Sequence, residues 1–93
     1  MNFTLKILRE ARKELDKLDN KSLIKIYSHL EELKRDPFRP RPTADITKIR
    51  GNRKPPAYRL RIGKIRVEYL VFDDERRVII SKIFTRRRGS DYR

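Results

Sequence analysis

Hydrophobic and polar residues alternate along the stretch 57–72, in two runs separated only by the dipeptide Gly63-Lys64. A two-residue loop between alternating runs predicts a tight β-hairpin, and the loop length fixes the register of its strands. In this register Arg61 lies opposite Arg66. The inner face, which must be buried, carries Tyr58, Leu60, Ile62, Ile65, Val67 and Tyr69. The outer face carries Arg59, Arg61, Arg66 and Glu68.

The chain before the hairpin contains one predicted strand and two predicted helices. Residues 2–8 alternate and therefore predict a strand. From about Glu10 the apolar residues recur at helical spacing, with a break at Asp19-Asn20. Either Asn20 or Ser22 can cap the second helix, which ends before Pro37. Its apolar stripe is Leu23, Ile26, Tyr27, Leu30 and Leu33. Helices this short need the apolar face of the sheet as a packing partner.

Five prolines predict a loop between residues 37 and 56, with a possible short extended piece at 46–49. We interpret the arginines of this loop, Arg41 among them, as phosphate or ribosome contacts without a chemical role. Residues 78–84 predict a last strand. We expect Lys82 on the arginine face of this strand, with Ile79 and Ile83 inward, because the opposite choice would bury an ammonium group.

The charge of the chain points to a polyanionic partner. The 93 residues carry 26 lysines and arginines against 13 acidic residues, a formal net charge of +13. No apolar run approaches the roughly 18 residues of a membrane span, and the first residues do not resemble a signal peptide, so we expect a cytoplasmic protein without a membrane partner. The absence of cysteine and the single histidine lead us to expect no metal site and no cofactor.

The predicted cross-strand pair of Arg61 and Arg66 is the strongest local sign of function. Like charges that face each other across a hairpin are destabilising. Such a pair on the exposed face predicts that both arginines bind an external anion, phosphate above all. Removing either one is then expected to leave stability unchanged or slightly raised. Arg59 is equally compatible with a surface ion pair to Glu68 and with a role in the site.

Several motifs in their order resemble the RelE toxin family of the RelE/ParE superfamily, and its archaeal type in particular. They are LDKL at 15–18, DP at 36–37, IRG at 49–51, YRLRIGKIRVEY at 58–69, and Arg86 followed six residues later by Tyr92. The resemblance implies an α+β fold over a single domain, residues 1–93. It comprises an N-terminal strand, a helical hairpin and a twisted antiparallel sheet with the helices on one face.

The resemblance also implies a function and a site. RelE-type toxins are ribosome-dependent endoribonucleases that cut mRNA in the decoding site, by attack of a ribose 2′-hydroxyl on the adjacent phosphate. Each is held inactive by a RelB-type antitoxin, here expected to be acidic and to form a heterotetramer with the toxin. The catalytic residues carried over by motif are Arg61, Arg66 and Arg86, with Tyr92 orienting the base. The resemblance implies Arg59 and Arg50 as substrate-binding residues, and we add Lys82 because we expect it on the arginine face.

The chain departs from the family pattern at Arg61, where relatives place lysine, a proposed proton acceptor. An arginine side chain keeps its proton at neutral pH, so we expect electrostatic stabilisation and geometry to dominate any cleavage. Two alternatives remain open from the sequence. One is a ParE-type toxin that inhibits DNA gyrase by binding, and the other is a catalytically silent basic module that binds RNA or the ribosome.

Overall fold

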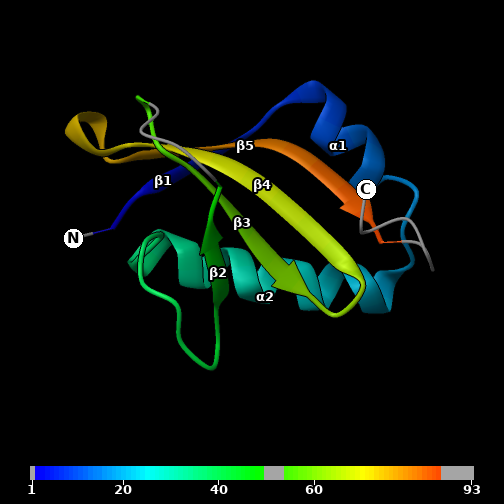
Figure 1. The fold of residues 1–93 in the computed structure, drawn as a ribbon. Coiled ribbons are helices and arrows are strands. Elements are labelled where there is room, and N and C mark those ends of the chain that lie inside the picture. The colour runs from blue at the N-terminus through cyan, green and yellow to red at the C-terminus, as the bar shows by residue number, and fades with distance from the viewer. Residues whose placement is uncertain (1, 50–53, 87–93) are drawn as a thin grey trace.

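The computed structural model describes residues 2–49 and 54–86 (Figure 1). In chain order the elements are β1 (Thr4–Ile7), α1 (Arg9–Leu15), α2 (Asn20–Arg35), β2 (Asp45–Lys48), β3 (Ala57–Ile62), β4 (Ile65–Phe72), a 3₁₀ turn (Asp73–Glu75) and β5 (Arg77–Thr85). In this part of the chain, neither helix is long and apolar enough to cross a lipid bilayer.

The five strands form one sheet in the order β1-β5-β4-β3-β2. Strands β2 to β5 pair antiparallel, whereas β1 pairs parallel with β5 at one edge. The long helix α2 packs behind the sheet, and α1 lies beside β5 (Figure 1). The predicted α+β fold, with a strand, a helical hairpin and a sheet covered on one face, is therefore confirmed. The parallel edge strand makes the sheet mixed, which the sequence reading did not include.

The central hairpin has the predicted register. Ile62 pairs with Ile65, Arg61 with Arg66, and Tyr58 with Tyr69. Gly63 occupies the turn with a φ of +59°. Glycine adopts this conformation readily because it has no Cβ atom that would clash with the backbone. The alternation of the sequence has therefore placed each side chain on the expected face of the sheet.

The core lies between the inner face of the sheet and the helices. Leu60, Val67 and Tyr69 of the sheet pack there against Ile26 and Leu30 of α2, all of them essentially inaccessible to solvent. Tyr58 and Tyr69 belong to this core as predicted. Tyr27, which we expected in the core or at its edge, is 44% exposed and lies outside the buried core.

The facing of β5 was only partly predicted. Lys82 is exposed and Ile83 is buried, as expected. Ile79, however, lies on the outer face opposite Leu70, while Ile80 points into the core. The reason is a β-bulge: Tyr69 pairs with Ile80 but Glu68 pairs with Lys82, so one extra residue reverses the alternation.

Both ends of α2 are capped by residues that the sequence reading did not choose. The cap at its start is Asp19, whose carboxylate accepts a hydrogen bond from the Ser22 backbone nitrogen at 2.9 Å, instead of Asn20 or Ser22. At its end the Arg41 guanidinium donates to the carbonyl oxygens of Glu32 at 2.8 Å and Asp36 at 3.0 Å.

The side chain of Arg41 is only 14% exposed. It also donates to the Arg39 carbonyl at 2.7 Å and to the Glu32 carboxylate at 3.2 Å. The Glu32 carbonyl also accepts from the Asp36 backbone nitrogen at 3.1 Å, so Arg41 adds a second hydrogen bond to this group and satisfies the Asp36 carbonyl that follows the helix. The interpretation of Arg41 as a phosphate contact is therefore wrong: this residue holds the loop after α2 against the helix.

Candidate functional site on the open face of the sheet

The face of the sheet opposite α2 carries two rows of mostly polar side chains that run across four strands. Pairing between neighbouring strands defines both rows. The first row consists of Asp45, Arg61, Arg66 and Phe84. The second row consists of Thr47, Arg59, Glu68 and Lys82. The first row lies next to the hairpin turn, so the arginine pair predicted from the sequence is at one end of this face.

Arg61 and Asp45 form an ion pair in the first row. The Nε atom of Arg61 donates to Asp45 Oδ2 at 2.8 Å. The two side chains are 60% and 49% exposed. Since β2 begins at Asp45, the carboxylate lies at the open edge of the sheet, beside the arginine pair. Sequence reasoning missed Asp45 because the pairing of β2 with β3 joins segments that no short turn connects.

Arg66 is not on an exposed surface, in contrast to our expectation. It is 6% exposed, and its Nη1 atom donates to the carbonyl oxygens of Gly63 at 2.8 Å and Ile65 at 3.3 Å. The guanidinium folds back over its own hairpin turn, where backbone carbonyls accept its protons. Arg66 therefore supports the turn as well as contributing positive charge to this end of the face.

The second row contains the ion pair that the sequence left open. Both Nε and Nη2 of Arg59 donate to Glu68 Oε2, at 3.1 and 2.7 Å. Lys82 pairs across the sheet with Glu68, and its Nζ lies 5.1 Å from the centroid of the Phe84 ring. Arg59 and Lys82 are thus both on the open face, with one carboxylate between them.

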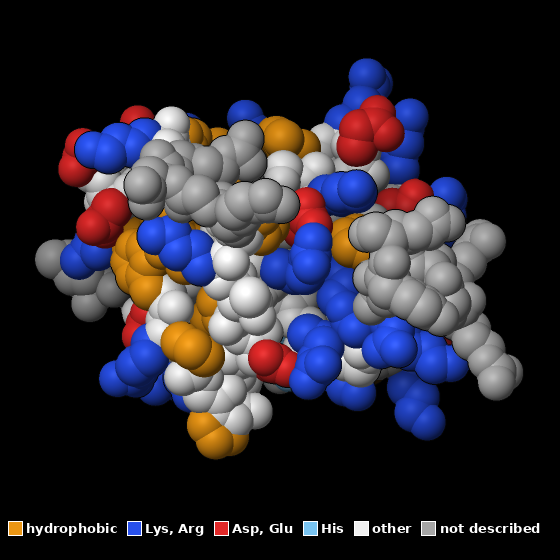
Figure 2. Space-filling view, viewed as in Figure 1, with side chains coloured by type: hydrophobic (Ala, Val, Ile, Leu, Met, Phe, Trp, Pro, Cys, Tyr) orange, Lys and Arg blue, Asp and Glu red, His pale blue; other side chains and the backbone are white. Residues whose placement is uncertain are grey.

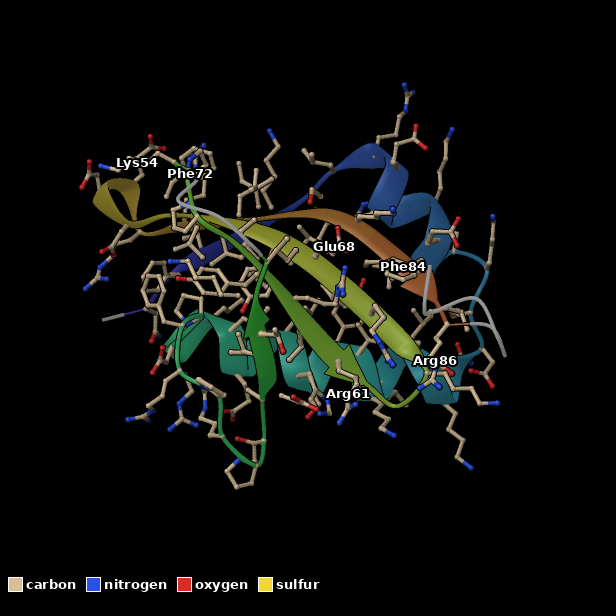
Figure 3. All side chains as sticks on the ribbon, in the orientation of Figure 1. Lys54, Arg61, Glu68, Phe72, Phe84 and Arg86 are labelled. Atoms are coloured by element: carbon tan, nitrogen blue, oxygen red, sulfur yellow. The ribbon has the colours of Figure 1, made fainter. Side chains whose placement is uncertain are left out.

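Arg86 reaches the same end of the molecule from the last strand. Its backbone nitrogen donates to the Lys64 carbonyl at 2.6 Å, which ties the end of β5 to the hairpin turn. Figure 3 shows Arg61 and Arg86 near this turn. Arg50 and Tyr92, two predicted site residues, lie outside the described residues.

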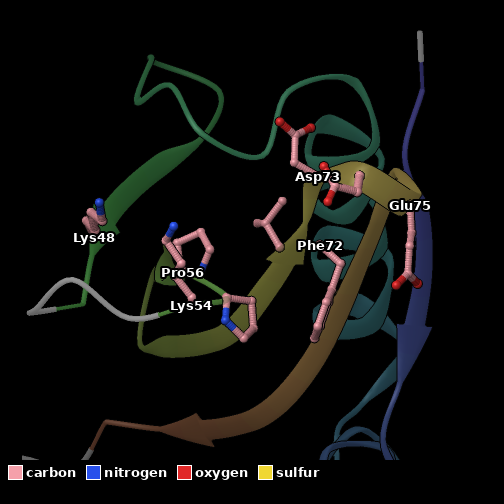
Figure 4. Close-up of a pocket in the computed structure, with 9 residues that line it drawn as sticks. Lys48, Lys54, Pro56, Phe72, Asp73 and Glu75 are labelled. Atoms are coloured by element: carbon pink, nitrogen blue, oxygen red, sulfur yellow. The ribbon is translucent and has the colours of Figure 1, made fainter.

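The two halves of the open face differ in character. Figure 2 shows lysine and arginine side chains gathered over one end of the sheet and hydrophobic side chains toward the other. At the second end Leu70, Phe72 and Ile79 are half-buried on the outer face. A pocket of about 580 Å³ lies beside them, with Phe72 between two lysines and three acidic residues (Figure 4). Its walls are Lys48, Lys54, Pro55, Pro56, Val71, Phe72, Asp73, Asp74 and Glu75.

The first row and Arg86 bring arginine side chains to one end of the open face. Guanidinium groups bind phosphate oxygens through paired hydrogen bonds and carry their charge at any physiological pH. Several of them around one point stabilise the negative charge that builds up on a phosphate during cleavage. Among the described residues, this end of the face therefore combines guanidinium groups with the adjoining carboxylate of Asp45.

The sequence and the fold are similar to those of known toxins. A family model described as the ParE toxin of the type II toxin-antitoxin system parDE matches residues 5–89. A candidate toxin named RelE1 from Methanocaldococcus jannaschii is 39% identical over 90 residues, which cover 97% of this chain and 96% of that protein.

Solved structures agree with this similarity. A chain in the crystal structure of the archaeal RelE–RelB complex from Pyrococcus horikoshii OT3 superposes with a TM-score of 0.83 and 28% identity, over 96% of this chain and 100% of that chain. The isolated E. coli RelE toxin superposes with a TM-score of 0.76 and 23% identity, over 97% of this chain and 90% of that one.

Proposed function

Because this chain belongs to the ParE/RelE toxin family of type II toxin-antitoxin systems, we propose that it is a ribosome-dependent endoribonuclease that cuts mRNA in the decoding site. The observation that carries this proposal is the arginine pair of the first row, with Arg86 tied to the same hairpin turn. Two guanidinium groups opposite each other on one face can bind the same phosphate, and a phosphate-cleaving site uses both charges.

The proposed reaction is attack by the 2′-hydroxyl of one nucleotide on its own 3′-phosphate. Arg61 and Arg66 stabilise the charge on the phosphate, and Arg86 stabilises the leaving 5′-oxygen. Arg59, Lys82 and Arg50 hold the neighbouring backbone, and Tyr92 orients the base. The ribosome presents the mRNA in an extended form, which supplies the in-line geometry that this chemistry requires. The protein acts in the cytoplasm, where translating ribosomes are found.

The proposal predicts new mRNA ends on translating ribosomes. When the purified protein is added to a translating extract, primer extension should locate cuts at a fixed position within the codon in the decoding site. The upstream fragments should carry 2′,3′-cyclic phosphates, because the nucleophile is the neighbouring hydroxyl. The same RNA without ribosomes is the control and should remain intact.

Gyrase inhibition is the second candidate, because the matching family model is described as a ParE toxin. An assay of supercoiled DNA with gyrase separates the two functions. Breaks trapped in the DNA, with intact mRNA on ribosomes, would support the second candidate. Ribosome binding without breaks in either nucleic acid would identify a silent basic module.

We propose an acidic RelB-type antitoxin as the partner, in a heterotetramer of two toxins and two antitoxins. The Pyrococcus structure contains RelE together with RelB, and the charge of +13 favours an acidic partner. Apolar anchors of the antitoxin are proposed to meet Leu70 and Phe72, where the open face turns apolar.

The antitoxin proposal predicts that part of the partner folds on binding. Calorimetry of complex formation should then show a large negative heat-capacity change, since coupled folding buries much apolar surface. Native mass spectrometry of the complex checks the stoichiometry. A heat-capacity change close to zero would mean that the partner is already folded before it binds.

A further inference from the structure

The first row contains one carboxylate, that of Asp45, and it contacts only one edge of the Arg61 guanidinium. Asp45 binds the Nε atom of Arg61, which is the inner edge of the guanidinium. Within the described part of the chain, the two terminal nitrogens of Arg61 and the second oxygen of Asp45 have no hydrogen-bond or ion-pair partner. A phosphate held by those terminal nitrogens would therefore lie next to the free carboxylate oxygen.

The proposed reaction needs a group that accepts the proton of the 2′-hydroxyl. Arginine cannot accept it, because its guanidinium stays protonated at neutral pH. The other carboxylate of the open face, Glu68, is less suited to this task. Its Oε2 atom is already held by two nitrogens of Arg59, its side chain is 21% exposed, and it lies in the second row.

We propose that Asp45 is a catalytic residue that accepts the proton of the attacking 2′-hydroxyl. This assignment rests on the endoribonuclease function proposed above. In the step, the O2′–H bond breaks and its proton moves to a carboxylate oxygen of Asp45, while O2′ forms a bond to phosphorus. The P–O5′ bond breaks, and its electron pair goes to O5′, which takes a proton from solvent. The products are a 2′,3′-cyclic phosphate and a 5′-hydroxyl.

Arg61 has two tasks in this arrangement. Its terminal nitrogens bind the phosphate, and its Nε orients the carboxylate at 2.8 Å. In the proposed complex, one side chain thus holds both the proton acceptor and the phosphate. Pairing with Asp45 also places a carboxylate next to the crowded arginines of the first row, which favours their positions in the free protein.

The test is the single-turnover cleavage rate of the Asp45→Asn variant on saturated ribosomes. Asparagine keeps an oxygen that accepts from Arg61 but cannot take up the proton, so the rate should fall by about 100-fold or more, as loss of a general base does. Ribosome affinity and thermal stability should stay close to those of the wild type. Asp73→Asn is the matched control, since Asp73 also pairs with an arginine, Arg76, at 3.0 Å but lies at the far end of β4.

A second measurement separates a proton acceptor from a proton donor. In an mRNA whose scissile 5′-oxygen is replaced by sulfur, the leaving thiolate needs no proton. The defect of Asp45→Asn should persist on this substrate, since the attacking hydroxyl must still lose its proton.

The two possible failures are distinguishable. Three results would each overturn the assignment of Asp45. The Asp45→Asn variant could cleave within threefold of the wild-type rate, or it could lose ribosome affinity while its cleavage rate is unchanged. The third result is a normal cleavage rate of the variant on the sulfur substrate. Absence of cleavage by the wild type would overturn the proposed function, and the assignment with it.

Discussion

Replacing Arg61 with alanine should lower the single-turnover rate of mRNA cleavage on saturated ribosomes by about two orders of magnitude or more. This corresponds to roughly 3 kcal/mol, the typical effect of losing one preorganised group that stabilises charge in the transition state. Ribosome affinity should fall far less, because the chain has 26 lysines and arginines and several of the others share in binding.

The stability of the Arg61→Ala variant should remain close to that of the wild type. The side chain is 60% exposed, and a surface ion pair such as that with Asp45 contributes about 0–1 kcal/mol. Loss of repulsion with Arg66 offsets part of this. Arg35→Ala is the matched control: Arg35 is a 73% exposed arginine on α2, and its removal should change neither rate nor stability.

Arg66→Ala should differ from Arg61→Ala in stability although both lose cleavage. We first expected both variants to be stable, but the burial of Arg66 changes that expectation. Its removal takes hydrogen bonds from the carbonyls of Gly63 and Ile65, so the free energy of unfolding should fall by about 1–3 kcal/mol. Thermal denaturation of the two variants side by side measures this difference. Equal stability would mean that Arg66 does not support the turn, and full activity of Arg61→Ala would place the phosphate elsewhere.

Arg41→Ala should be among the most destabilising single changes of a charged residue. The variant loses hydrogen bonds to two carbonyl groups at the end of α2, to the Arg39 carbonyl in the following loop and to the Glu32 carboxylate. We expect a cost of about 2–3 kcal/mol, which lowers the melting temperature by roughly 10–20 °C in a domain of this size. The chemical step of cleavage should be unaltered at temperatures where the variant is folded.

Arg39→Ala is the control for this prediction. Arg39 lies two residues away, its side chain is 74% exposed, and its carbonyl remains available to Arg41 after the substitution. Its removal should change stability by less than about 0.5 kcal/mol. If Arg41→Ala were as stable as Arg39→Ala but bound ribosomes more weakly, Arg41 would be a surface contact after all.

The effect of Arg41→Ala should also depend on pH. The hydrogen bond from Arg41 is the main cause that lowers the pKa of the Glu32 carboxyl below its usual value of 4.5. A carboxyl group whose pKa is lower in the folded than in the unfolded protein stabilises the fold at pH values above the unfolded pKa. This stabilisation is lost as the pH falls through the folded pKa. The stability difference between wild type and variant should therefore shrink as the pH falls below about 4.

The sequence by itself determined the hairpin. Alternation and a two-residue loop are local properties, so they fixed which residues of 57–72 face the core and which arginines oppose each other. Helical spacing and the prolines located both helices to within a few residues. The motif pattern that spans these elements also indicated the family, since it depends on residue order and needs no contacts.

Only the tertiary structure decided the features that join distant segments. The bulge that turns Ile79 outward forms only when β5 pairs with β4. The parallel edge of the sheet forms only when β1 pairs with β5. Asp45 and Arg61 are sixteen residues apart and meet only because β2 pairs with β3.

Arg66 and Arg41 show the same limit for charged side chains. Each was expected on a surface and is instead held by backbone carbonyls, of the hairpin turn and of the end of α2. The sequence shows where each arginine lies along the chain. It does not show which backbone carbonyls the fold brings close to the guanidinium group. The position of such a group depends on free energies of hydrogen bonding and desolvation that exist only once the chain has folded around it.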